Sequence, residues 1–129
     1  MEQNSFSSMF AGLADANLAA FKYTVGSLEV DVLDTLTTFM AVEVEKWKAE
    51  MDTAEELFQR ADIELKAAVS RNEPPEITDP LKADFAELKS SFEKVQEKFK
   101  ETLDKQDYLK EVHEEKQRNA ASPKRRASS

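Results

Sequence analysis

The stretch WKAEMDTAEELFQRADIELKAA, which runs from Trp47 to Ala68, decides the fold that this sequence predicts. Its apolar positions follow one another in alternating steps of four and three residues, and most residues between them are charged or polar. A repeat of about 3.5 residues is typical of helices that wind around each other with a left-handed twist. The positions are Trp47, Met51, Ala54, Phe58, Ala61, Leu65 and Ala68. We therefore expect a long helix with a narrow apolar seam that needs a partner.

A second seam with the same alternating steps begins at Leu81 and supplies that partner. Its positions are Leu81, Phe85, Leu88, Phe92, Val95, Phe99, Thr102 or Leu103, Gln106 and Leu109. We expect the phenylalanines of this helix to pack over the alanines of the first, because large side chains interdigitate with small ones. The central hairpin seam then consists of Met51, Phe58, Leu65, Phe85, Leu88, Phe92, Val95 and Phe99.

Between the two seams lies the segment RNEPPEITDP. Its double proline removes two backbone donors and pushes the preceding residue away from helical geometry. Asp79 can cap a following helix, and Pro80 suits the first helical position, where a missing N–H has no consequence. The sequence thus predicts an all-α fold, a long antiparallel, coiled-coil-like hairpin over residues 27–118 with a loop at residues 71–80.

Before Trp47 the apolar positions spread more widely than one seam requires. A broad apolar stripe indicates contact with two neighbours rather than one, and small two-helix cores rarely hold together alone. We therefore expect this surface to lack a partner within the chain and to form the interface of a homodimer or of a complex with a helical protein partner. The predicted interface residues are Leu28, Val32, Leu36, Phe39, Met40, Val44 and Trp47.

The N-terminal segment, residues 1–26, carries apolar residues at helical spacing, but it also contains Gly12 and Gly26. Each glycine costs about 1 kcal/mol in a helix relative to alanine. We predict a short amphipathic helix that packs on the hairpin or on an oligomer partner, with a kink or break at Gly26.

The C-terminal segment, residues 119–129, reads NAASPKRRASS and contains no apolar anchor. We expect a disordered basic tail, because such a segment has too little apolar surface to bury. Ser122 precedes a proline, and Ser128 follows Arg125, Arg126 and Ala127, so both resemble kinase sites. Phosphorylation there would offset the positive charge. The alternative is a passive solubilising or nuclear-targeting-like tail.

Charge limits the classes of function. The 129 residues carry a net charge of −8, and the first seventy hold 13 acidic against 5 basic side chains. An acidic body repels phosphate-rich surfaces, so we expect no nucleic-acid binding by the folded region. The chain has no cysteine and no apolar run of the length that a membrane span needs. A cytoplasmic protein is therefore expected, with at most a peripheral contact with a membrane.

No arrangement for catalysis is visible in the sequence. The single histidine, His113, stands in a charged segment without the Cys or second His that a metal site would need, so we expect it to be a solvated surface residue. No phosphate loop, dinucleotide fingerprint or nucleophile constellation is present. We expect a protein that is not an enzyme and that holds no cofactor or metal.

Two stretches carry a further resemblance, VLDTLTTFMAVEVEKWKAEMDTAEELFQRADIELKAAVSRN from Val32 to Asn72 and SSFEKVQEKFKETL from Ser90 to Leu103. Their helical pattern resembles that of the BAR domains of membrane-remodelling and small-GTPase-linked proteins. The resemblance implies an antiparallel helical homodimer with a curved, lipid-facing surface, and it assigns no individual lipid-binding residue.

The predicted function is that of a non-enzymatic, self-associating scaffold or adaptor that binds a protein partner or a membrane surface, as a BAR domain does. Two alternatives stay open. One is a coiled-coil subunit of a protein assembly without lipid binding. The other is a phasin-like amphipathic coat on a hydrophobic inclusion, which an apolar N-terminal segment would suit.

Overall fold

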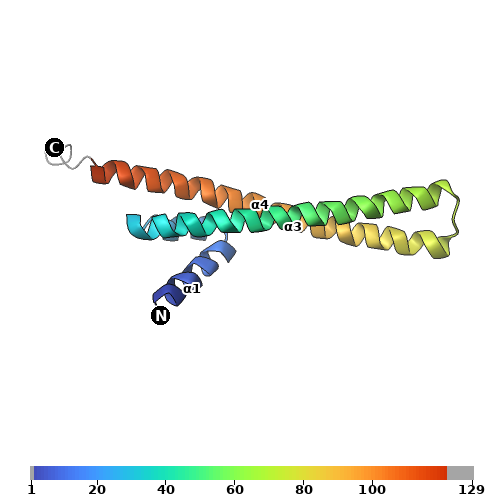
Figure 1. Cartoon of the computed structure of the whole chain (residues 1–129), viewed down its shortest axis with the longest axis horizontal. Coiled ribbons are helices and arrows are strands. Elements are labelled where there is room, and N and C mark those ends of the chain that lie inside the picture. Colours follow the sequence, from blue (N-terminus) through green and yellow to red (C-terminus); the bar gives the residue numbers. More distant parts are fainter. Residues whose placement is uncertain (1, 122–129) are drawn as a thin grey trace. The chain divides into compact units, whose positions relative to one another are not determined.

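The computed structural model describes residues 2–121, with side chains from residue 8 to residue 119. Four helices make up this part of the chain, and no strand occurs in it (Figure 1). The helices are α1 (Glu2–Asp15), α2 (Leu18–Val25), α3 (Val30–Ser70) and α4 (Pro75–Ala121). The predicted all-α fold with two long helices is therefore confirmed. Residues 119–121 belong to α4 rather than to a disordered tail, and Ser122 and Ser128 lie outside the described residues.

The chain forms two compact units. Unit 1 consists of residues 1–44 and 101–129, and it holds α1, α2, the first part of α3 and the last part of α4. Unit 2 consists of residues 45–100, and it holds the remainder of α3 and α4 with the loop that joins them. Four helical segments thus build the described part of unit 1, whereas only two build unit 2.

The loop between the long helices is shorter than the predicted loop, because α4 begins at Pro75 rather than at Pro80. The carbonyl oxygen of Pro74 accepts a hydrogen bond from the N–H of Ile77 at 2.9 Å, which is the first bond of the helix. Pro75 therefore occupies the first helical position, where its missing N–H would have no partner. The next proline, Pro80, lies inside the helix near its start.

Asn72 lies two residues after Ser70, the last residue of α3, and its backbone φ is 56°, in the left-handed region. Its N–H donates to the carbonyl oxygen of Val69 at 3.0 Å, and the N–H of Glu73 donates to that of Ala68 at 3.1 Å. These two bonds form a Schellman motif, which satisfies carbonyl groups that the end of a helix leaves without partners. Asparagine is among the few residues with a side chain that adopt this conformation readily.

We expect Asn72→Gly to leave the free energy of unfolding unchanged or slightly raised. We expect Asn72→Ala to lower it by about 1 kcal/mol, because the alanine Cβ is strained at a positive φ. Urea unfolding followed by far-UV circular dichroism measures both variants. Equal stability of the alanine and glycine variants would contradict the left-handed conformation of Asn72.

The N-terminal segment forms two helices rather than the single helix that the sequence predicted. Asn17 separates them, and its Oδ1 accepts a hydrogen bond from the N–H of Ala20 at 2.8 Å. This contact caps α2 and fixes its first residue. A second break follows at Gly26, as predicted, before α3 begins at Val30.

The core of unit 1 surrounds the first turns of α3. It takes buried apolar side chains from all four helices of the unit, and the rings of Phe10 and Phe39 add a contact with centroids 5.5 Å apart. The buried members are Phe10, Leu13, Phe21, Val25, Leu33, Leu36, Met40 and Leu109. The N-terminal segment thus packs on the long helices of its own chain, which was one of its two predicted positions.

Lys105 of α4 attaches α1 to this core. Its side chain is fully buried, and its Nζ donates hydrogen bonds to the carbonyl oxygens of Leu13 at 3.2 Å, of Ala14 at 2.8 Å, and of Ala16. Leu13 and Ala14 belong to the last turn of α1, and Ala16 directly follows that helix. The carbonyl oxygen of Leu13 also accepts a hydrogen bond from the N–H of Ala16 at 3.3 Å, and the ammonium group adds a donor where the regular bonding of the helix ends. The carboxylate of Glu101 lies 3.3 Å from the same ammonium group. The buried charge therefore has both an ionic partner and hydrogen bonds, which burial of a charge requires.

Lys116 makes a similar contact at the end of α2. It follows Lys105 by eleven residues, about three helical turns, and so it lies on the same face of α4. Its Nζ donates hydrogen bonds to the carbonyl oxygens of Gly26 at 3.0 Å and of Leu28. Two lysines of one helix thus cap the ends of two successive helices, where positive charge is favourable.

We expect Lys105→Met to lower the free energy of unfolding by about 2–3 kcal/mol, because the buried carbonyl groups at the end of α1 lose their donor. Lys110→Met is the matched control, since Lys110 is an exposed lysine of the same helix and its loss should change stability by less than about 0.5 kcal/mol. Chemical denaturation measures both. Equal effects of the two substitutions would show that the buried ammonium does not stabilise unit 1.

In unit 2, the segments of α3 and α4 share an apolar seam that centres on Phe58. Its ring stacks on that of Phe85, with centroids 5.9 Å apart, and on that of Phe92, with centroids 5.1 Å apart and planes 8° from parallel. Ala61 and Ala68 are buried in the same unit. Around Phe58, the predicted packing of phenylalanine over alanine is therefore replaced by ring stacking, because α3 itself contributes an aromatic ring to the seam.

Candidate functional site

The predicted interface, which consists of Leu28 and six residues of α3, is largely covered from within the chain. Leu36 and Met40 are fully buried in the core of unit 1, and Leu28, Val32 and Phe39 pack against that core. The expectation that this surface lacks a partner in the chain is therefore wrong for these five residues. The elements that cover this surface are α1, α2 and the last part of α4. The spacing of the hairpin seam alone did not predict these contacts.

The remaining two predicted interface residues are half-buried. Val44 lies at the end of the α3 segment in unit 1, and Trp47 lies in unit 2. The ammonium groups of Lys46 and Lys98 lie 5.0 Å and 5.9 Å from the centroid of the Trp47 ring. These distances are those of cation–π contacts, so Trp47 has partners within its own unit.

The hairpin seam of unit 2 is open by comparison. All eight of its predicted residues are half-buried, and none is buried: Met51, Phe58, Leu65, Phe85, Leu88, Phe92, Val95 and Phe99. Of the apolar residues of unit 2, only Ala61 and Ala68 are buried. Two helices cover each other along one line of contact, and their flanks remain accessible to a further element. The seam therefore has room for a third helix.

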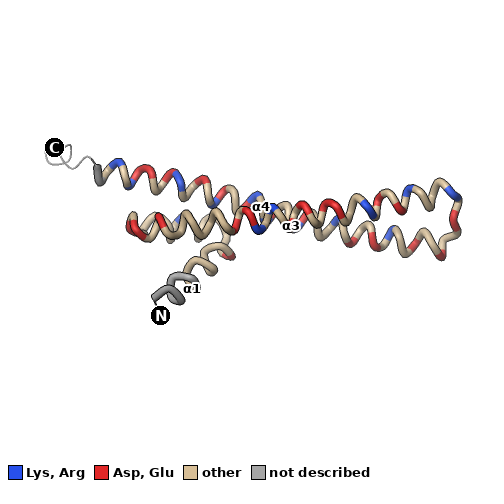
Figure 2. The backbone as a smooth tube through the Cα atoms, in the orientation of Figure 1, with Lys and Arg blue, Asp and Glu red and all other residues tan. Residues whose placement is uncertain are grey.

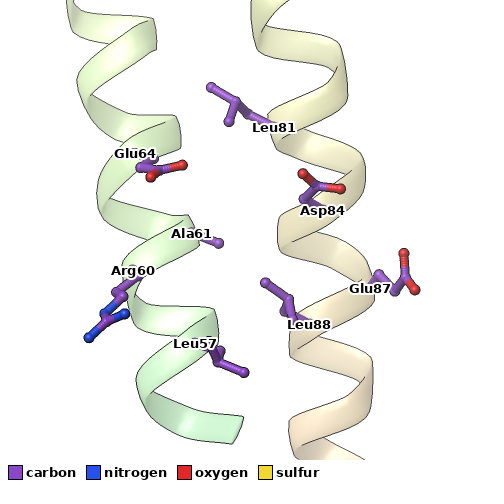
Figure 3. Close-up of a pocket in the computed structure, with 8 residues that line it drawn as sticks. All are labelled: Leu57, Arg60, Ala61, Glu64, Leu81, Asp84, Glu87 and Leu88. Carbon is purple, nitrogen blue, oxygen red and sulfur yellow. The ribbon is translucent and has the colours of Figure 1, made fainter.

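A groove of about 360 Å³ lies on one flank of this seam, between α3 and α4. Leu57, Ala61, Leu81 and Leu88 point into the space between the helices (Figure 3). Leu57 is 45% exposed, so its side chain is available to an incoming group. Each wall covers eight residues, 57–64 and 81–88, about 10 Å of helix from first to last, which corresponds to two turns.

The rim of the groove is predominantly acidic. Glu64 comes from α3, and Asp84 and Glu87 come from α4. The only basic residue of the lining, Arg60, makes an ion pair with Glu56 one turn earlier at 2.7 Å. Arg60 and Glu87 both point away from the groove, so Glu64 and Asp84 are the carboxylates nearest to its opening (Figure 3). The site therefore combines an apolar floor with a rim of negative charge.

No group of three or more His, Cys, Asp or Glu side chains within residues 8–119 could hold a metal ion. His113 is half-buried rather than solvated, and its Nε2 lies 2.8 Å from Oδ1 of Asp34. The geometry of this contact is not that of a hydrogen bond, and Nε2 has no other hydrogen-bond partner among the described residues.

Sequence reasoning found part of this site. It assigned Leu88 to the hairpin seam and placed Ala61 and Leu81 in the two repeats, but it missed Leu57. Leu57 directly precedes the seam residue Phe58, and an apolar residue beside a seam position widens the apolar stripe toward one flank. This local widening of the apolar stripe is the feature of the sequence that could have predicted the role of Leu57.

Comparison of the chain with protein-family models, with curated proteins and with solved structures gives no match. The geometry of the chain itself therefore carries the functional inference. Within residues 2–121, none of the helices combines the length and the apolarity that crossing a bilayer requires.

Proposed function

We propose that this protein is a non-enzymatic helical scaffold, in which the open seam of unit 2 binds an additional helix. The observation that carries the proposal is that all eight seam residues are half-buried. The groove at Leu57, Ala61, Leu81 and Leu88 is the place where the added helix docks. Apolar side chains that leave water in such a groove supply the binding free energy.

The occupant is a helix because of the backbone chemistry of the site. Both walls of the groove are helices, whose main-chain donors and acceptors are already used internally, so they offer no edge to an extended peptide. An incoming segment must satisfy its own backbone groups, and an amphipathic helix does so while presenting an apolar stripe. A third helix on two others also completes the kind of bundle that buries such a seam.

The arrangement of charges favours a protein partner over a lipid surface. From Lys46 onward in α3, and along α4, Lys and Arg are interspersed with Asp and Glu, and the first part of α3 carries acidic residues alone (Figure 2). Attraction to an anionic membrane depends on clustered basic residues on one face. In a BAR-like dimer, a second copy of the chain would supply the added helix, and the melting temperature would then fall on dilution.

A synthetic amphipathic peptide tests the groove without knowledge of the natural partner. The probe is a fluorescent helical peptide with leucines at positions i, i+4 and i+7 and uncharged flanks, added to the full chain. We expect Leu57→Gln to weaken its binding by about tenfold, because one apolar wall of the groove is lost. Fluorescence anisotropy measures the affinity.

Ile63→Gln is the matched control, because Ile63 is an apolar residue of the same helix that is 66% exposed and does not line the groove. The proposal predicts unchanged binding for this control. Equal binding by both variants, or no binding to the unmodified chain up to about 1 mM peptide, would overturn it.

A further inference from the structure

We infer that the helix bound in the groove of unit 2 is a basic amphipathic helix of a different protein, with Lys or Arg on both sides of its apolar stripe. This inference rests on the proposed function and adds the chemistry of the partner. It follows from the carboxylates on the groove rim, from their lack of internal partners, and from the net charge of the unit.

The rim carboxylates are unneutralised. Glu64, Asp84 and Glu87 are exposed, and among the residues that the structure describes none of the three makes an ion pair. Arg60 does not offset them, because its guanidinium is engaged by Glu56. Complementary charges across an interface steer encounter and select partners, so this rim favours a cationic ligand and disfavours an anionic one.

The carboxylates are placed on both walls. Glu64 stands on the α3 side and Asp84 on the α4 side, with the apolar side chains between them, whereas Glu87 lies on the outer side of α4 (Figure 3). A helix that lies along the groove with a leucine stripe facing its floor presents its two flanking rows of residues to these two walls. Basic side chains in both rows would then meet acidic partners, and their alkyl stems would cover the rims of the groove.

A second copy of this chain is a poor occupant. Between residues 45 and 100 the sequence carries 14 acidic and 10 basic side chains, so two copies of unit 2 repel each other on approach. No such repulsion opposes a basic helix from another protein. Charge complementarity therefore distinguishes a heterologous partner from self-association.

Two peptides that differ only in charge test the inference. Both carry the same leucine stripe at i, i+4 and i+7, and the flanking positions are lysine in one and glutamate in the other. We expect the lysine peptide to bind the full chain at least about tenfold more tightly at low salt, and we expect this preference to shrink in ~0.5 M salt, where exposed charges are screened.

The triple variant Glu64→Gln, Asp84→Asn, Glu87→Gln should lose most of the preference for the lysine peptide while its binding of the uncharged peptide is unchanged. The matched control, Glu93→Gln with Glu97→Gln, removes two exposed carboxylates of α4 that do not line the groove, and it should keep most of the preference.

The outcomes separate the two proposals. If the lysine and glutamate peptides bind equally well, or if the triple variant keeps the full preference, the inference of a basic partner is wrong while the helix-binding groove stands. If binding of all three peptides is insensitive to Leu57→Gln, the groove itself is not the site. Sedimentation of the chain alone as a stable dimer that Leu57→Gln dissociates would identify a second copy as the occupant and overturn the inference.

Discussion

The buried ammonium group of Lys105 is the constraint on which the organisation of unit 1 depends. A charge can be removed from water only where opposite charge and hydrogen-bond acceptors surround it. Here the acceptors are the terminal carbonyl groups of α1, and the carboxylate of Glu101 is the ionic partner. The contact therefore fixes where α1 ends and holds it against α4. Lys116 acts at the end of α2, so two side chains of α4 hold the C-terminal ends of both N-terminal helices, in addition to the apolar core that these helices share with α3 and α4.

The N-terminal helices bury the apolar core of unit 1, whereas the apolar seam of unit 2 stays half-exposed. The broad apolar face at Leu36 and Met40 is used inside the chain, where it packs with residues of α1, α2 and α4. Unit 2 has no comparable cover, because only two helical segments build it. Its seam stays half-exposed, and its flank at Leu57 and Leu88 forms an acidic-rimmed groove. Binding is therefore expected in the part of the chain where the fewest elements share the apolar surface.

The two long helices could be predicted from the sequence, because alternating steps of four and three residues are a property of the local sequence alone. The position of α4's start could not be read with the same certainty, since Pro75 and Pro80 both suit a first helical position and only the bond to the carbonyl of Pro74 distinguishes them. Lys105 was missed because the seam was continued through Gln106 instead. A charged residue at a seam position looks like an error in the pattern until the helix end that it caps is known. The sequence also did not show that α1 and α2 pack on α3. For this reason Leu36 and Met40 were wrongly predicted to lack a partner within the chain.

The central claim is that unit 1 has a closed core and unit 2 an open seam, and hydrogen exchange of the free, full-length chain followed by mass spectrometry tests it most directly. Helical amides exchange through local opening, whose free energy depends on how well the segment is packed. The structure predicts that amides of residues 31–44 and 101–116 exchange more slowly, by about tenfold or more, than those of residues 51–70 and 81–95. Equal protection of the two sets, or stronger protection in unit 2, would contradict the claim.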